Sequence, residues 1–121
     1  MDILSTPRMQ ALEKTMATAH KECTSGRHLY IYAFGALPME QGKGYGHRLM
    51  QFLTKAADYN NCPAYLETGG IKNVNFYMKN DFEVKHVYPI EVDGTKFDPD
   101  GIGGLSAMVR NPKNQGEIQT Y

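Results

Sequence analysis

Three glycines, Gly42, Gly44 and Gly46, lie between a run of strand-forming residues and an amphipathic segment. We expect this loop to lead into the first turn of a helix. There the first backbone N–H groups have no partner within the helix, and the helix dipole is positive. A helix start of this kind binds anions, phosphate in particular, and glycine lets the backbone approach closely because it has no Cβ atom. The loop is therefore the first candidate for a binding site.

The segments on both sides of the loop indicate how it is held. Residues 28–37 are rich in tyrosine, isoleucine and phenylalanine, which predicts a strand covered on both faces. Residues 47–59 have apolar side chains at helical spacing, and residues 63–68 predict a second strand. A strand, a helix and a strand in this order predict a parallel pair joined by a right-handed crossover.

The remaining elements predict the rest of the domain. We expect a helix before the first strand and, after the second, a helix, a strand, a hairpin loop and a last strand, over residues 5–24, 72–80, 82–90, 91–103 and 104–110. The last strand should return antiparallel to the one before it. The fold class is therefore α/β (α+β), one domain over residues 1–112 with a mixed sheet of about four strands and flanking helices. Residues 113–121 are expected to be a polar tail.

Composition excludes several classes of function. The chain has 121 residues and as many basic as acidic side chains, 13 of each, so no net charge attracts it to nucleic acid or to a membrane surface. No apolar run suits a membrane span and the first residues do not resemble a signal peptide, so we expect a cytoplasmic protein. Cys23 and Cys62 fit no metal spacing and are expected to be free thiols. The acidic stretch Asp93–Asp100 lacks the ligand spacing of a calcium loop, so we expect a solvated hairpin and no metal.

Two well-known phosphate-binding motifs do not fit the loop. A P-loop needs a lysine and then a serine or threonine after its last glycine, whereas Lys43 precedes Gly44 here. A dinucleotide fingerprint needs GxGxxG directly after a strand, but the spacing here is GxGxG and four residues intervene. Glu67 lies where an acid would bind a ribose, yet the chain is expected to turn antiparallel after it.

A third motif matches better. Residues 37–50, LPMEQGKGYGHRLM, resemble the acetyl-CoA-binding motif of the GNAT superfamily of N-acetyltransferases. Gln41, Gly44 and Gly46 occupy its three defining positions. Downstream, residues 65–68 (YLET) and 73–84 (NVNFYMKNDFEV) are similar to the second motif of the family, in the expected order and at the expected separation. The resemblance implies a GNAT-like sheet, acetyl-CoA as co-substrate and an amine, on a small molecule or a protein, as acceptor.

The resemblance also implies which residues bind acetyl-CoA. The backbone amides of residues 42–46 would bind the pyrophosphate, and the main chain of Ala36 and Leu37 would pair with the pantetheine arm. Lys43 and Arg48 either add positive charge near the phosphates or are solvated. The expected set is Ala36, Leu37, Gln41, Gly42, Lys43, Gly44, Tyr45, Gly46 and Asn73.

Two residues are candidates for catalysis. In the family, a tyrosine at the position of Tyr77 protonates the departing CoA thiolate, and an ordinary phenol is protonated at neutral pH. The alternative is a core aromatic beside Phe76. Glu67 is the candidate general base, acting directly or through water, or else it is a structural carboxylate. No residue of the motifs requires a covalent intermediate, although Cys62, just before the second strand, leaves that route open.

The sequence departs from the family pattern in three places, one of which is Gly70, where many relatives carry a polar residue. Asp81 stands where a glycine usually precedes the phenylalanine, so we expect aspartate to adopt a left-handed turn there. The family usually has early strands and helices that help wall the acceptor pocket, and this sequence begins at the helix that follows them. We therefore expect either the C-terminal part of a longer protein or a reduced protein with an N-terminally truncated sheet. Its first strand would have an open edge, through which a homodimer could form. Two other functions therefore stay open: a CoA-binding module without catalysis, and an interaction domain.

Overall fold

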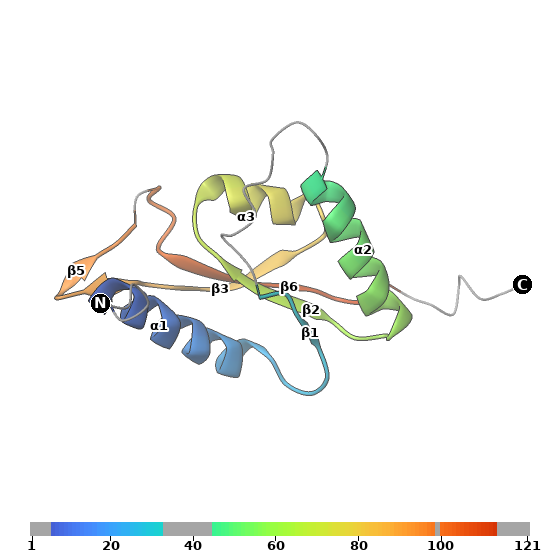
Figure 1. Ribbon diagram of the computed structural model, residues 1–121, viewed down its shortest axis with the longest axis horizontal. Helices are drawn as coiled ribbons and strands as arrows, with labels where there is room; N and C mark the ends of the chain where they lie inside the picture. The colour runs from blue at the N-terminus through green and yellow to red at the C-terminus, as the bar shows by residue number, and fades with distance from the viewer. Residues whose placement is uncertain (1–5, 33–44, 99, 114–121) are drawn as a thin grey trace, which may run out of the picture.

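The computed structural model describes residues 6–32, 45–98 and 100–113. Three helices and six strands follow one another along this part of the chain (Figure 1). In order they are α1 (Pro7–Cys23), β1 (Leu29–Tyr30), α2 (Tyr45–Tyr59), β2 (Ala64–Thr68), α3 (Ile71–Met78), β3 (Glu83–Tyr88), β4 (Glu91–Val92), β5 (Thr95–Lys96) and β6 (Leu105–Arg110). No helix of the described residues is long and apolar enough to cross a membrane.

Four of the strands form one mixed sheet in the order β1-β2-β6-β3. β1 pairs parallel with β2, which confirms the parallel pair that the sequence predicted, with α2 as the connection. β6 is antiparallel to both of its neighbours, β2 and β3. The last strand of the chain therefore lies between two earlier strands, a placement that the sequence analysis did not predict.

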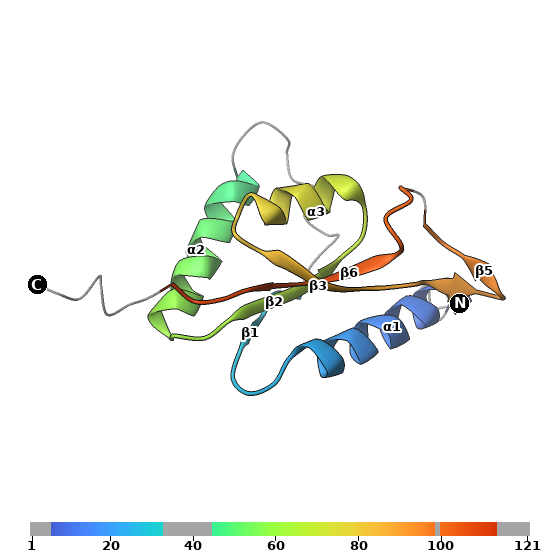
Figure 2. The same ribbon diagram turned by 180° about the vertical axis from the view of Figure 1, so that it is seen from behind.

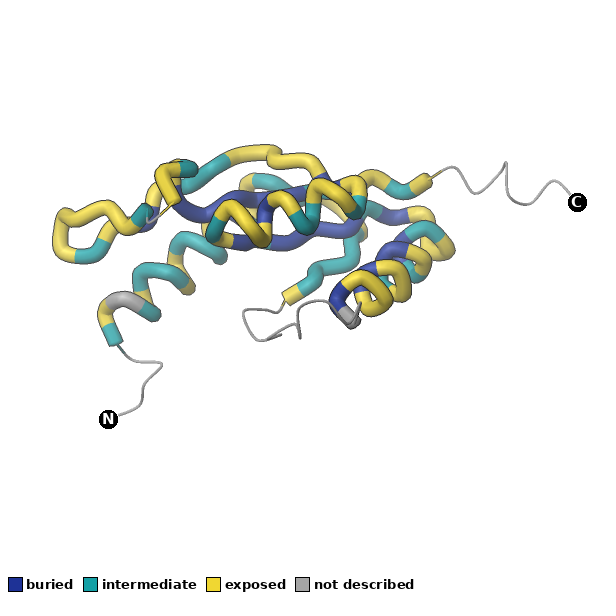
Figure 3. The backbone as a smooth tube through the Cα atoms, turned by 90° about the horizontal axis from the view of Figure 1, so that it is seen from above, coloured by how far each residue is buried: buried dark blue, intermediate teal, exposed yellow. Residues whose placement is uncertain are grey.

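Helices cover both faces of this sheet. α2 and α3 lie on one face and α1 on the other (Figures 1 and 2). Side chains alternate along β2: Ala64 and Leu66 point to the α2 and α3 side, whereas Tyr65 points to the α1 side. All three are at most 2% exposed, and the buried strands lie between exposed helix faces (Figure 3).

The first strand differs from the sequence prediction. Residues 28–37 were expected to form a strand covered on both faces, but the described strand is Leu29–Tyr30, at one end of the sheet. Its residues are half-buried, and Tyr32 is 67% exposed. The apolar side chains of β1 explain its partial burial. They do not determine whether a strand has another strand on one side or on both sides. Residues 33–37 lie outside the described residues, and the homodimer through this edge stays a prediction.

The predicted hairpin over residues 91–103 contains two short strands. β4 and β5 pair antiparallel around a turn in which Asp93 and Gly94 both have positive φ, 52° and 78°. Such a turn matches the twist of the two strands. Asp81 has φ 72°, which confirms that an aspartate takes the left-handed position before Phe82.

Candidate active site at the end of β2

The strands β1 and β2 stop pairing before β2 ends. Leu29 is opposite Ala64 and Tyr30 opposite Tyr65, and the Ile31 backbone N–H donates to the Tyr65 carbonyl at 2.8 Å. β2 continues to Thr68, where β6 still pairs with it. Among the described residues, β2 therefore has no backbone partner on its β1 side from Glu67 onward. We call this edge of β2, from Glu67 onward, the β1–β2 gap; a free sheet edge is where an extended ligand can pair by main-chain hydrogen bonds.

Most of the expected acetyl-CoA ligands cannot be placed. Those outside the described residues are Ala36, Leu37, Gln41, Gly42, Lys43 and Gly44. α2 begins at Tyr45, two residues earlier than expected, and Gly46 is buried in its first turn. The helix N-terminus thus directly follows the glycine loop, as an anion site at that point requires. The role of these residues in binding stays a prediction.

Tyr77 lies half-buried on α3, on the side of the sheet that carries α2. Its ring contacts Phe76 and Phe82 edge to face, with centroids 5.3 and 5.9 Å apart. Burial raises the pKa of Tyr77 above that of an exposed phenol. The residue thus combines the packing of a core aromatic with a hydroxyl that stays protonated at neutral pH.

Glu67 lies on the opposite face of β2, on the α1 side. The hydroxyl of Tyr30 donates a hydrogen bond of 2.5 Å to its Oε1 atom. The other oxygen, Oε2, is buried and has no hydrogen-bond partner among the described residues. Burial raises the pKa of Tyr30 and the hydrogen bond to Glu67 raises it further, so this phenol remains a donor to the carboxylate. Glu67 is therefore oriented by a fixed neighbour through one of its two oxygens.

Tyr30 was not recognised as a site residue from the sequence. Its place next to Glu67 depends on the register of β1 and β2, which sets Tyr30 opposite Tyr65. Tyr65 and Glu67 are two residues apart and share a face, so Tyr30 reaches the carboxylate from the neighbouring strand. The sequence showed only a tyrosine in the predicted strand before the glycine loop. Without the register of β1 and β2, nothing indicated that this tyrosine contacts Glu67.

Both ends of the turn before α3 are held by side chains. The Asn73 side-chain amide donates to the Gly69 carbonyl at 3.0 Å. Asp100 accepts a hydrogen bond of 2.9 Å from the Ile71 backbone N–H, the first of α3. The sequence predicted a solvated hairpin over the acidic stretch and gave no indication of this contact. Whether Asn73 also binds acetyl-CoA stays a prediction.

No group of three or more histidine, cysteine, aspartate or glutamate side chains in the described part of the chain is placed to hold a metal ion. Asp98 is occupied within its own loop, where its two carboxylate oxygens accept from the backbone N–H groups of Ile102 and Gly103 at 2.9 and 2.8 Å.

Comparison with known proteins gives one finding. The model of the acetyltransferase (GNAT) family matches residues 11–82, which include most of α1, the glycine loop, β2 and α3. The search among curated proteins found no match. The matched residues contain both Glu67 and Tyr77.

Proposed function

The chain belongs to the acetyltransferase (GNAT) family, and from this premise we propose that it transfers an acetyl group from acetyl-CoA to an amine. Membership of the family supports acetyltransferase activity in general. The proposal adds acetyl-CoA as the donor, an amine as the acceptor, and direct attack of the amine on the thioester. One observation supports it: Glu67, hydrogen-bonded by Tyr30, lies on one face of the sheet, and the half-buried Tyr77 lies on the side of the other face.

This placement suits acyl transfer in which the acceptor approaches from one face of the sheet and the departing thiolate is protonated from the other. The pantetheine arm would pair with the free edge of β2 in the gap and hold the thioester there. The acceptor would enter from the α1 face, where Glu67 takes a proton from its ammonium group. Tyr77, on the other face, would donate a proton to the departing thiolate. The proposal therefore assigns the base and the acid to different sides of the gap.

The glycine loop would hold the other end of the same ligand. In the sequence, residues 42–46 lead into α2, which begins at Tyr45. In this proposal, the pyrophosphate binds at that helix start, where free N–H groups and the helix dipole favour negative charge. Binding at a site distant from the reacting carbonyl would orient the thioester for attack.

The acid role of Tyr77 is tested by Tyr77→Phe. This substitution removes the hydroxyl and keeps the ring, so acetyl-CoA should bind as before while kcat falls about a hundredfold. Tyr59→Phe on α2 is the matched control, because Tyr59 is 84% exposed, and it should leave kcat unchanged. The measurement is acetyl transfer to a panel of amines by mass shift, with acetyl-CoA binding by calorimetry.

The outcomes separate the open functions. Unchanged kcat in Tyr77→Phe would show that another group protonates the thiolate. Acetyl-CoA binding without transfer to any amine would indicate a CoA-binding module, and no binding at high micromolar acetyl-CoA would indicate an interaction domain.

A further inference from the structure

Two histidines lie beside the tyrosine that holds Glu67. His20 is in the last turn of α1 and His28 directly precedes β1, and their Nε2 atoms are 2.8 Å apart. We call these two residues the histidine pair. The His20 ring packs against the Tyr30 ring, with centroids 4.0 Å apart, and Tyr30 donates to Glu67 Oε1 at 2.5 Å. Each step from His28 to Glu67 is therefore a direct contact.

The segment between α1 and β1 sets the protons of the histidine pair. Gly26 takes the left-handed conformation there, with φ 73°, and its carbonyl oxygen is 2.9 Å from the His28 Nδ1 atom. A carbonyl only accepts, so Nδ1 carries the proton, and the Nε2 atom of the neutral His28 ring is an acceptor. The His20 Nε2 atom must then donate to it. This arrangement of protons fixes the direction of the His20 imidazole.

The direction of the His20 ring limits how Tyr30 can move. The rings of His20, Tyr30 and Tyr65 contact one another, with centroids 4.0 to 5.5 Å apart. β1 is two residues long and half-buried, so its backbone gives Tyr30 little support. Rotation about the Cα–Cβ bond of a tyrosine moves the ring and the hydroxyl together, so packing on the ring also holds the hydroxyl. His20 is the member of this cluster that comes from a helix.

We propose that the histidine pair positions Glu67: His28 orients His20, His20 holds the Tyr30 ring, and Tyr30 holds the carboxylate. The inference rests on the proposed function, in which Glu67 takes a proton from the acceptor. A base must lie within hydrogen-bond reach of that proton, and a small displacement lowers the rate strongly. His20 and His28 are positioning residues in this role, because both act through Tyr30.

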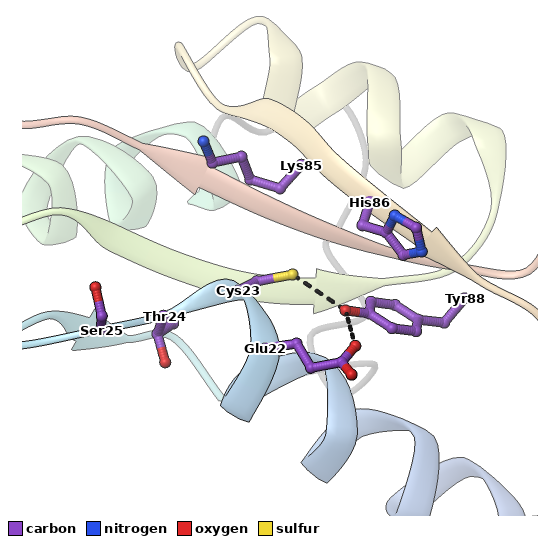
Figure 4. A pocket seen from close by; sticks show the side chains of 7 residues that line it. All are labelled: Glu22, Cys23, Thr24, Ser25, Lys85, His86 and Tyr88. Carbon is purple, nitrogen blue, oxygen red and sulfur yellow. Dashed lines mark hydrogen bonds between the residues drawn. The ribbon is translucent and has the colours of Figure 1, made fainter.

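A third histidine offers a matched control. His86 is exposed on β3, and its ring contacts that of Tyr88 with centroids 4.6 Å apart. Both line a pocket of about 510 Å³ in which the Tyr88 hydroxyl donates to Glu22 at 2.8 Å (Figure 4). Within the described ranges, His86 makes no ring contact or hydrogen bond with Tyr30 or Glu67. Its substitution should therefore leave the base in place.

Two substitutions of His28 separate its two hydrogen bonds. His28→Asn keeps an amide for Gly26 but is too short to reach His20, whereas the longer amide of His28→Gln still accepts from His20. We expect the asparagine variant to lose about tenfold in kcat with both KM values unchanged, and the glutamine variant to stay within about twofold of the wild-type rate. His86→Asn should leave kcat unchanged. If His28→Asn does not fold, His20→Phe, which keeps a ring against Tyr30 and loses the hydrogen bond, should show the same loss.

A double substitution tests whether the histidine pair acts through Glu67. In Glu67→Gln the base is already lost, so adding His28→Asn should not lower the residual rate further. Losses that multiply would overturn the inference. A wild-type rate in His28→Asn would overturn it as well, and so would a glutamine variant as slow as the asparagine variant.

A second measurement does not depend on turnover. The proton of a short, charge-assisted hydrogen bond gives a downfield NMR signal, and that of the Tyr30 hydroxyl should exchange with water about tenfold faster in His28→Asn but not in His28→Gln. Equal exchange in the wild-type protein and the asparagine variant would contradict the positioning role. If the wild-type protein acetylates no amine, the proposed function fails, and this exchange alone decides whether the histidine pair holds Tyr30 against Glu67.

Discussion

At the scale of single residues, two carboxylates, Asp58 and Glu67, are held by a side chain from another element. Arg110, on β6, is 5% exposed and binds Asp58 of α2 through two hydrogen bonds of 2.8 and 3.0 Å. Asp58 also accepts from the Lys113 backbone N–H at 2.9 Å. This carboxylate joins the end of α2 to the end of β6. Glu67 differs because its second oxygen has no hydrogen-bond partner within the described ranges.

We predict that Asp58→Ala lowers the free energy of unfolding by about 3 kcal/mol, because it leaves the Arg110 guanidinium buried without its partner. Lys113→Ala is the control: it removes the contact of Lys113 Nζ with Asp81, in which both side chains are 60% exposed, and should cost less than about 1 kcal/mol. Urea unfolding measures both. If Asp58→Ala and Lys113→Ala lower the free energy of unfolding by equally small amounts, the buried pair contributes little to stability.

The same pair has a defined pH dependence. The hydrogen bond from Arg110 holds the pKa of Asp58 below its usual value, against the effect of burial. Its stabilisation is therefore complete above the unfolded pKa of about 3.9 and is lost as the pH falls through the lower, folded pKa. The stability difference between the wild-type protein and Asp58→Ala should be constant near neutral pH and shrink in that acidic range.

At the scale of elements, α3 depends on a distant loop for its position. Its N-cap residue is Gly70, which has no side chain to cap the helix. Asp100, which lies 29 residues further along the chain, supplies the acceptor for the Ile71 N–H instead. A carboxylate at this end also interacts favourably with the helix dipole. The loop after β5 thereby fixes the start of the helix that carries Tyr77.

We predict that Asp100→Ala destabilises the protein by about 1 kcal/mol, as the loss of an N-cap usually does, and that Asp100→Asn costs less because its side-chain oxygen still accepts. The exchange of α3 backbone amides with solvent should be faster in the alanine variant. Thermal unfolding and hydrogen exchange give the two measurements. An alanine variant as stable as the wild-type protein would show that α3 is held by packing alone.

At the scale of the whole molecule, both faces of the sheet contribute to one core. The cluster under α2 and α3 centres on Leu66 and Met108, and the cluster above α1 centres on Tyr65. Because β2 and β6 contribute to both, the two layers of helices are linked through these two strands.

We predict that Met108→Ala lowers the free energy of unfolding by about 2 to 5 kcal/mol, because Met108 is fully buried and the substitution leaves a cavity. Met78→Ala is the matched control, since that side chain is 54% exposed, and it should change stability little. Denaturation followed on tyrosines of both faces should show one transition. Two separate transitions would mean that the layers fold independently.

The sequence by itself determined the local structure. The helix over residues 7–23, the strand–helix–strand unit and the antiparallel return of β6 against β3 follow from hydrophobic spacing, from Pro7 and from turn residues. These signals are local in the chain, so the sequence carries them directly. The glycine loop and the residues around Tyr77 likewise indicate the family through their order and spacing along the chain.

Only the tertiary structure decided which distant residues meet. Strand pairing placed β6 between β2 and β3 and brought Tyr30 to Glu67. Loop folding brought Asp100 to α3, and the packing of α1 aligned Cys23 with Tyr88. The side-chain contacts of Asp100, Tyr30 and Cys23 join residues that are 29, 37 and 65 positions apart. They depend on register and packing, which no local pattern of side chains specifies.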